Sequence, residues 1–450
     1  MFSGKHVAEE AMKPPAEVAW LPEVFRNAGF ATAGFVSNEL MTAKEGFGRG
    51  FDAFTQPLPE HGSNAPILEW VRAHAGQKTF TLVHLIEPHD PYDPPADLRR
   101  WTDEKGALGP ARLRWFEEVS KQEGLVEHDA SVAEIEKRIG QYDDEVRAGD
   151  RRIGEILEMY KAGGMWADTA VIVAADHGEG LFTHVQLPIG TRKKAMDAGE
   201  PPTLLNTLLM THGSHVDIEL LHVPLIIKAP GLKPASVTGW VENVDVLPTV
   251  LELAGVAIPK SVQGQSLVPI AEHPSDKSRL RECVVSYSRY YTSVIDQDSM
   301  QVILPSPRGE CDFGLTPRVY DLAHDPECRN DLASSRRELV KRAEACSASV
   351  SSQAIREQSG PVDSAQMRAL QGMGYVGDVV DHVRQELAEA SVGALLKTIA
   401  EPGDCFRRLE AARALEVREL EVDERAKVRE ILKREISPAI RAELERVLSK

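Results

Sequence analysis

Short apolar segments alternate with helix-like segments along the first half of the chain. The strand-like segments are runs of β-branched and small apolar residues, of the kind that a parallel sheet buries on both faces, at residues 31–36, 79–85, 169–175 and 223–231. The helix-like segments carry apolar residues near helical spacing, at residues 17–28, 66–75, 131–162 and 243–256. This alternation predicts an α/β domain built on a mostly parallel sheet.

The pattern changes after about residue 275. Residues 282–296, 299–305 and 318–322 resemble antiparallel strands, and beyond residue 333 the sequence is nearly all helical. We therefore expect three regions, which are an α/β core at 1–272, a small α+β subdomain at 273–377 and a helical tail at 378–450.

The tail carries apolar stripes at helical spacing, formed by Val428, Ile431, Leu432, Ile440, Leu444, Val447 and Leu448. A stripe of this kind must be buried somewhere, so we expect the helices to pack on the body of the protein or on one another. The alternative is a partner surface, which leaves oligomer formation through the tail open.

Charge and hydropathy narrow the class of protein. The net charge of −17 over 450 residues argues against nucleic-acid binding, which needs a basic face. Any anion site on this acidic chain must therefore be built locally. No apolar run approaches the roughly 18 residues that a membrane helix needs, so we expect no membrane span.

The cysteines and the start of the chain bear on the compartment. The five cysteines lie far apart without metal-type spacing, which indicates a reducing compartment or incidental residues rather than a disulfide framework. No signal peptide opens the sequence. The chain as it stands is therefore expected in the cytoplasm, unless a signal sequence belongs before Met1.

Two metal-ligating side chains follow directly after the apolar run at 169–175. Asp176 offers a carboxylate and His177 an imidazole, both of which bind divalent ions, and Gly178 lets the backbone approach closely. A polar turn after a strand is also ordinary, because Asp and Gly favour turns for conformational reasons. Ligands of open α/β sheets bind beyond the carboxyl ends of the strands, so this turn is a candidate metal site.

Two histidines stand in a proline-rich segment at the end of another expected strand. His84 and His89 lie in "VHLIEPHDPYDPP" at 83–95, where prolines fix φ and make the loop pre-shaped. A lone loop histidine is usually only solvated. Two beside a strand end are better placed to bind an anion or to donate a proton.

Three more histidines flank the last core strand. His212 and His215 precede the run at 223–231, and a surface or helix-capping role fits His215 equally well. His222 stands among apolar residues and is expected to be structural. Metal ligands and histidines gathered at strand ends would form a cationic pocket suited to a tetrahedral oxyanion.

These segments together resemble the sulfatase family, within the alkaline-phosphatase-like superfamily. The resemblance rests on "TAVIVAADHGEGL", "HLIEPHDPY", "HGSHVDIELLHVPLIIKAPG" and "VENVDVLPTVLELAGVAIPKSVQGQSLVPI" in this order. It runs from residue 1 to about 377 and leaves the helical tail uncovered. It implies an α/β/α sandwich with a mostly parallel sheet, followed by the small antiparallel subdomain.

The resemblance also implies roles for the candidate residues. Asp176 and His177 would ligate a divalent metal, with calcium first and magnesium, manganese or zinc left open by the histidine. His89 and His84 would contact the sulfate or phosphate group of a small-molecule ester. His212 would act as general acid toward the leaving-group oxygen.

The sequence departs from the family pattern at its beginning. The family nucleophile lies in a Cys/Ser-x-Pro-x-Arg or Thr/Ser-x-Pro-Ser-His segment, and an Asp pair on the first strand completes the metal site. Neither is present, and "MFSG" looks like the end of the helix that follows the nucleophile. We therefore expect a truncated chain that is inactive as it stands, with a gap or an exposed edge in its sheet and weak metal binding or none.

Two other accounts fit the same departure. The chain could be a non-catalytic binding or partner protein that keeps a sulfatase fold, or one half of a split enzyme. The role of the segment between Leu181 and Thr211 also has two interpretations. We expect a surface insertion whose apolar "LLNTLLM" packs on the body, with a substrate lid as the alternative.

Overall fold

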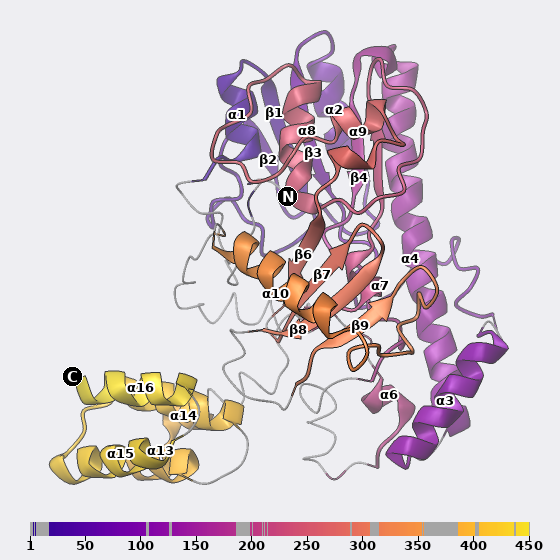
Figure 1. The fold of residues 1–450 in the computed structure, drawn as a ribbon. Helices are drawn as coiled ribbons and strands as arrows, with labels where there is room; N and C mark the ends of the chain where they lie inside the picture. The colour runs from indigo at the N-terminus through magenta and orange to yellow at the C-terminus, as the bar shows by residue number, and fades with distance from the viewer. Residues whose placement is uncertain are drawn as a thin grey trace.

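The computed structural model places most of the expected elements (Figure 1). The residues that it describes are 3, 5, 18–104, 108–125, 128–185, 199, 201–208, 210, 212–213, 215–288, 290–306, 315–352, 354, 386–400, 405–435 and 438–449.

A three-stranded parallel sheet forms the first part of the core. Its strands are β1 (Ala31–Val36), β2 (Ala53–Thr55) and β3 (Thr79–His84), in the order β2–β1–β3. Val36 stands opposite His84 in the register, so β1 and β3 end at the same edge. The expected strands at 31–36 and 79–85 are thus confirmed, whereas β2 was not predicted.

The second part of the core is a two-stranded sheet of β4 (Val171–Ala174) and β5 (Leu225–Lys228). These strands are antiparallel, with Val171 opposite Lys228, so the expectation of a mostly parallel sheet is wrong for this pair. Within the described ranges, β3 and β4 belong to separate sheets. The gap expected from a missing first strand stays a prediction.

Helices cover both faces of the parallel sheet. They are α1 (Leu21–Asn27), α2 (Ala65–Ala73), α4 (His128–Ala162), η2 (Asn243–Asp245) and α8 (Val246–Leu253). Val83 packs with Ile67 of α2 and Ile156 of α4 on one face, while Phe80 packs with Leu21 of α1 and Leu247 of α8 on the other. Alternate residues of β3 therefore face opposite layers, as side chains of a strand must.

Two further helices pack against the N-terminal half of α4. They are α3 (Pro110–Glu123) and α6 (Leu204–Thr207), which lie beside that end of α4 in Figure 1. Leu204 and Leu208 are buried against Phe116 and Ile135, so this part of "LLNTLLM" packs on the body as expected. Helix α3 was not predicted from the sequence. Residues 186–198 lie outside the described ranges, and the lid alternative stays untested.

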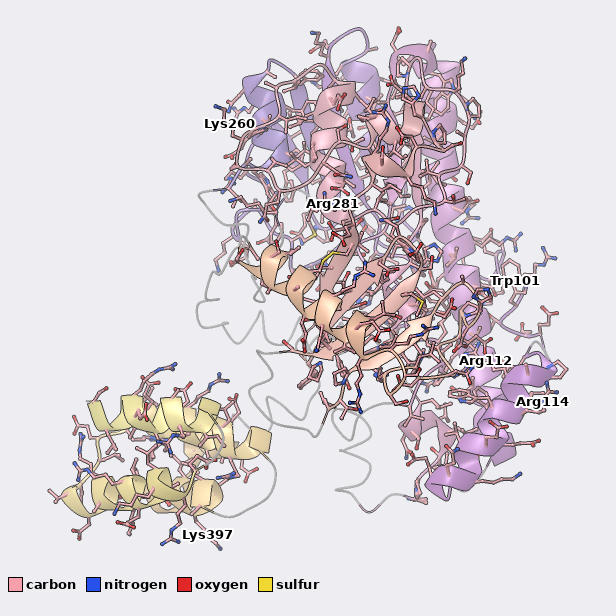
Figure 2. All side chains as sticks on the ribbon, viewed as in Figure 1. Trp101, Arg112, Arg114, Lys260, Arg281 and Lys397 are labelled. Atoms are coloured by element: carbon pink, nitrogen blue, oxygen red, sulfur yellow. A yellow bond between two sulfur atoms is a disulfide. The ribbon has the colours of Figure 1, made fainter. Side chains whose placement is uncertain are left out.

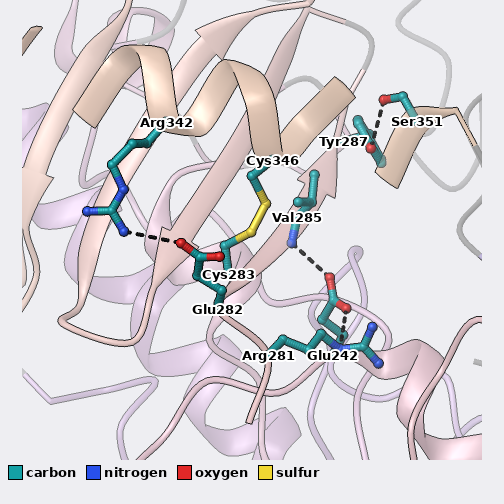
Figure 3. The surroundings of a disulfide bond; sticks show 9 residues. All are labelled: Glu242, Arg281, Glu282, Cys283, Val285, Tyr287, Arg342, Cys346 and Ser351. Carbon is teal, nitrogen blue, oxygen red and sulfur yellow. Dashed lines mark hydrogen bonds and ion pairs between the residues drawn. A yellow bond between two sulfur atoms is a disulfide. The ribbon is translucent and has the colours of Figure 1, made fainter. Parts of the chain in front are cut away.

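The small subdomain is an antiparallel sheet of β6 (Cys283–Tyr287), β7 (Tyr291–Asp296), β8 (Met300–Pro305) and β9 (Arg318–Asp321). Helix α10 (Arg337–Ser351) covers one face. A disulfide joins Cys283 of β6 to Cys346 of α10 (Figure 3). The expectation of incidental cysteines is therefore wrong for this pair, while Cys328 is a buried free thiol.

The core and the subdomain meet through charged and apolar contacts. Arg281, labelled in Figure 2, ion-pairs with Glu242 at 3.1 Å and with Asp245 of η2. On the sheet face away from α10, Ile303 packs with Val216 of the core. The remaining short elements are η1 (Trp166–Asp168), α7 (Ile218–Leu221), α9 (Val268–Glu272) and η3 (Lys277–Arg279).

The described part of the tail includes the helices α13 (Val392–Ala400), α14 (Cys405–Glu416), α15 (Val422–Arg434) and α16 (Pro438–Ser449). Leu396, Leu409, Val428 and Leu444 meet in one buried cluster, so the stripes are buried against one another. In the described part of the chain, no helix is long and apolar enough to cross a membrane. The expected boundary at 377–378 lies outside the described residues.

Candidate active site

The candidate site begins where β3 and β4 end. His84 is the last residue of β3, and Asp176 lies two residues after β4. His177 and His84 hold the pKa of Asp176 below its usual value, although desolvation opposes this shift. Burial lowers the pKa of His84, and Asp176 works against that effect. The two strand ends are therefore coupled electrostatically across the break in the sheet.

Three histidine rings meet beside this carboxylate. His177 stacks on His212 with 4.2 Å between ring centroids and 26° between planes, and His89 stands edge-on to His212 at 5.1 Å. His177 Nε2 also lies 3.9 Å from Asp176 Oδ2. His89, His212, His177 and Asp176 thus form one group of neighbouring side chains, and His84 interacts with it electrostatically through Asp176.

A glycine makes the close approach of the segments possible. The Gly178 N–H donates to the Leu220 carbonyl at 2.8 Å. A Cβ atom at Gly178 would lie 2.0 Å from the Glu219 carbonyl oxygen, which no side chain tolerates. The turn after β4 is therefore held against α7, and His177 reaches the segment that carries His212.

Glu179 forms a hydrogen bond with His212. No role for Glu179 was predicted from the sequence. Its Oε2 accepts hydrogen bonds from His212 Nδ1 at 3.1 Å and from the Tyr92 hydroxyl at 3.2 Å. His212 and Tyr92 lower the pKa of Glu179, even though burial favours the neutral acid. Because Glu179 is ionised, Nδ1 of His212 is the donor of this hydrogen bond. Glu179 could have been suspected from the sequence, because it lies in the polar segment directly after β4.

His89 has its own fixed orientation. Its Nδ1 donates to the Asp90 carbonyl oxygen at 2.6 Å. Burial lowers the pKa of His89, and the neighbouring His212 and His177 rings act in the same direction. The neutral ring therefore predominates until a negative charge comes near Nε2.

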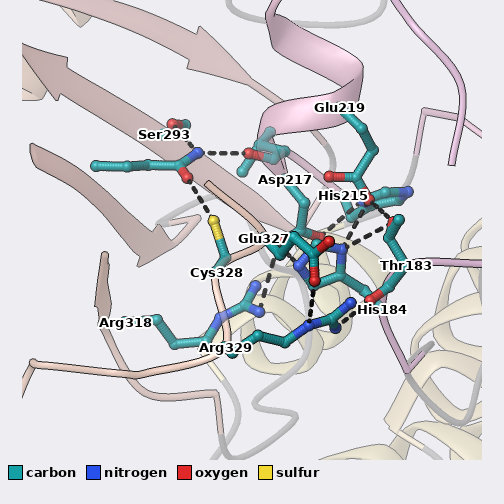
Figure 4. A network of polar contacts seen from close by, with 12 residues as sticks. Thr183, His184, His215, Asp217, Glu219, Ser293, Arg318, Glu327, Cys328 and Arg329 are labelled. Carbon is teal, nitrogen blue, oxygen red and sulfur yellow. Dashed lines mark hydrogen bonds and ion pairs between the residues drawn. The ribbon is translucent and has the colours of Figure 1, made fainter. Parts of the chain in front are cut away.

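A second buried network fixes the segment behind His212 (Figure 4). His184 Nδ1 lies 2.7 Å from Glu219 Oε1, and its Nε2 lies 3.9 Å from Asp217 Oδ1. Asp217 also bonds His215 Nδ1 at 2.7 Å and ion-pairs with Arg318 of β9 at 3.5 Å. This network connects the site segment to the subdomain sheet.

The network settles the two remaining histidines. His215 is buried, so a surface role is wrong for it. Its Nδ1 atom forms a hydrogen bond with Asp217, the residue before α7. His222 stands edge-on to Trp240 with 5.2 Å between ring centroids. That contact agrees with the structural role expected for His222.

The metal ligands predicted from the sequence supply two donors. Asp176 and His177 offer a carboxylate and an imidazole, whereas a hard cation such as calcium takes about six to eight oxygen ligands. A group of three metal-type donors does occur in the described part of the chain, at Glu60, His61 and Glu145. Asp176 and His177 alone therefore do not fit a complete metal site, and we derive no step through a metal there.

Models of two known protein families match parts of this chain. A model of the family described as sulfatase matches residues 1–256. The chain belongs to the sulfatase family. A model described as N-sulphoglucosamine sulphohydrolase, C-terminal, matches residues 215–301, which include β6 and β7 of the subdomain. The resemblance and the α/β fold expected from the sequence are thus confirmed.

Individual relatives are similar in sequence to parts of this chain. It is 26% identical over 203 residues to arylsulfatase K of Xenopus laevis, covering 43% of this chain and 33% of the relative. It is 26% identical over 302 residues to a multifunctional alkaline phosphatase superfamily protein of Trinickia caryophylli, covering 59% of this chain and 54% of the relative. The chain therefore spans between a third and about half of these relatives.

A solved structure shares the fold. The phosphonate monoester hydrolase of Silicibacter pomeroyi superimposes with a TM-score of 0.54 at 18% identity, covering 77% of this chain and 83% of that one. The match supports the α/β core and the antiparallel subdomain as one arrangement. The roles of individual site residues stay predictions.

Proposed function

We propose that this chain binds the sulfate group of a sulfate ester between His89, His177 and His212, as part of a site for hydrolysing that ester. The stacking of His177 on His212, with His89 edge-on, carries the proposal. Imidazole groups gathered this closely favour a negatively charged ligand between them. A tetrahedral oxyanion supplies that negative charge.

His212 is suited to the role of general acid. Its Nδ1 is held by Glu179, so the imidazolium presents its Nε2 proton to the ester. As the bond between sulfur and the bridging oxygen breaks, that oxygen takes the proton and leaves as an alcohol. His89 and His84 orient the other sulfate oxygens.

The reaction also needs a nucleophile, and no family motif for one occurs in residues 1–450. A covalent mechanism without its nucleophile keeps only the help of binding and electrostatics. We therefore expect residues 1–450 alone to hydrolyse aryl sulfates and phosphates at negligible rates. With Asp176 and His177 alone, divalent metal binding at this site is expected to be weak; in a completed site, calcium is the first candidate.

The substrate class extends to related esters. Some relatives are named arylsulfatases, and a phosphonate monoester hydrolase shares the fold, so sulfate monoesters and phosphate or phosphonate monoesters are both candidates. The missing motif also favours a second function, a binding protein that retains a sulfatase fold. That protein would hold the anion and release it unchanged.

The test compares residues 1–450 with an extended chain, in which a segment carrying an Asp pair and a Cys, Ser or Thr nucleophile precedes Met1. Turnover of 4-nitrophenyl sulfate and phosphate is measured for both. We expect turnover in the extended chain alone, a reduction of it in His212→Ala, and none of this effect in His324→Ala, whose side chain is 84% exposed on the subdomain.

Two other results would change the proposal. Anion binding by both chains without turnover by either would favour the binding protein. Robust turnover by residues 1–450, abolished by His212→Ala, would show that a residue of this chain acts as the nucleophile.

A further inference from the structure

A second group of ionisable side chains lies apart from the histidine cluster. Glu60 and His61 belong to the segment between β2 and α2, and Glu145 belongs to the middle of α4. One potential ligand atom of each lies within 4.8 Å of the others. His61 Nε2 is 3.3 Å from Glu145 Oε1 and 3.7 Å from Glu60 Oε1.

Glu145 is the buried member of this group. Its side chain has no exposed surface, and Oε1 accepts the Asp93 N–H at 3.0 Å. Oε2 has no hydrogen-bond partner among the described residues. A buried carboxylate oxygen left without a partner is costly, and this carboxylate faces His61. The arrangement is therefore incomplete without a further ligand.

The charges around His61 are also unbalanced. Glu87 Oε1 lies 3.5 Å from His61 Nδ1 and pairs with Arg152 at 2.7 Å, and the nearby Asp93 pairs with Arg99 at 2.9 Å. Glu60, Glu87 and Glu145 thus place three carboxyl groups around His61, and Arg152 supplies one guanidinium against them.

We propose that Glu60, His61 and Glu145 bind a divalent transition-metal ion of the zinc class, separate from Asp176 and His177. An imidazole nitrogen with carboxylate oxygens suits Zn²⁺ better than calcium or magnesium, which prefer oxygen ligands alone. Glu60 is 40% exposed, so water has access to a fourth position. Glu87 faces the other ring nitrogen, as a carboxylate commonly does behind a metal-bound histidine.

The cation would brace a loop of the candidate active site. The His61 N–H donates to Glu87 Oε1 at 2.8 Å, and Glu87 stands two residues before His89. A metal ion between Glu60, His61 and Glu145 therefore connects the segment after β2, helix α4 and the His89 loop. Its role is to hold that loop in place.

The experiment measures zinc binding to the whole chain after metal removal by a chelator. Calorimetry with ZnCl₂ is expected to show one tight equivalent, confirmed by elemental analysis after dialysis. His61→Gln and Glu145→Gln are each expected to weaken it by at least about tenfold. The double variant Asp176→Asn/His177→Gln is the matched control, and we expect it to retain the equivalent.

Folding is checked separately, because Glu145 is buried. Circular dichroism reports the fold of each variant, and Glu60→Gln, at a half-exposed position, gives a third ligand change that the fold tolerates. If Glu60→Gln and His61→Gln bind zinc as tightly as the unaltered chain, the proposal is wrong. The same holds if the unaltered chain takes up no zinc, or if only the Asp176/His177 variant loses it.

Discussion

The Nδ1 atom of His212 lies 3.1 Å from Oε2 of Glu179, and the Tyr92 hydroxyl donates to the same oxygen at 3.2 Å. Glu179 therefore fixes the tautomer of His212. The contact joins the turn after β4 to the segment before α7.

Glu179→Gln removes the carboxylate that orients His212 through its Nδ1 atom. In the extended chain, we expect kcat to fall by up to about 10²–10⁴ for esters of aliphatic alcohols, which is the usual contribution of a general acid. The loss is smaller for 4-nitrophenyl sulfate, because nitrophenolate leaves without a proton. Steady-state kinetics on both ester types checks this; an equal loss on both would exclude the acid role.

Anion binding is expected to weaken as the pH rises. Burial lowers the pKa of His89 from its ordinary value of 6.5, and only the imidazolium donates to sulfate from Nε2. Affinity for inorganic sulfate is therefore highest at low pH and falls as the pH rises through the His89 pKa. Calorimetry from pH 5 to 8 measures the trend. His89→Ala is expected to bind about tenfold or more weakly at low pH and to flatten it.

Gly178→Ala tests the close approach of the turn to α7. A Cβ there would lie 2.0 Å from the Glu219 carbonyl oxygen, so we expect a loss of about 3 kcal/mol in the free energy of unfolding. Gly154→Ala is the matched control, because its Cβ would meet nothing within 4 Å and alanine favours a helix by about 1 kcal/mol. Denaturant unfolding compares the two; equal stabilities would contradict the geometry.

The raised pKa of His184 leads us to expect that the stability of the fold depends on pH. Asp217 and Glu219 raise its pKa above the ordinary 6.5, although burial opposes this. A raised folded-state pKa stabilises the fold fully below pH 6.5, and the benefit disappears as the pH rises through the raised value. Thermal unfolding from pH 6 to 9 is expected to show this decline, and His184→Gln to lack it. A decline of the same size in His184→Gln would assign it to another group.

Much of the site followed from the sequence because strand ends meet in space. The runs before His84 and Asp176 had the composition of buried strands, and ligands bind beyond such ends in open sheets. That rule placed His84, His89, Asp176, His177 and His212 in one region before any contact was known. It needed only local patterns and the order of segments.

Contacts between distant segments could not be predicted in the same way. An apolar run carries no sign of its direction, so the antiparallel pairing of β5 with β4 was missed. Cys283 and Cys346 are separated by 63 positions, and their spacing indicates no pairing. The hydrogen bond from His212 to Glu179 spans 33 positions and depends on the turn at Gly178.

The most direct measurement is nuclear magnetic resonance of the imidazole groups of residues 1–450, titrated with inorganic sulfate. The account predicts saturable shifts of the His89, His177 and His212 signals with one common dissociation constant, while His324 on the exposed subdomain surface stays unchanged. Glu179→Gln should alter the response of His212 most. Shifts at all histidines alike, or no saturable shift at these three, would contradict a sulfate site between them.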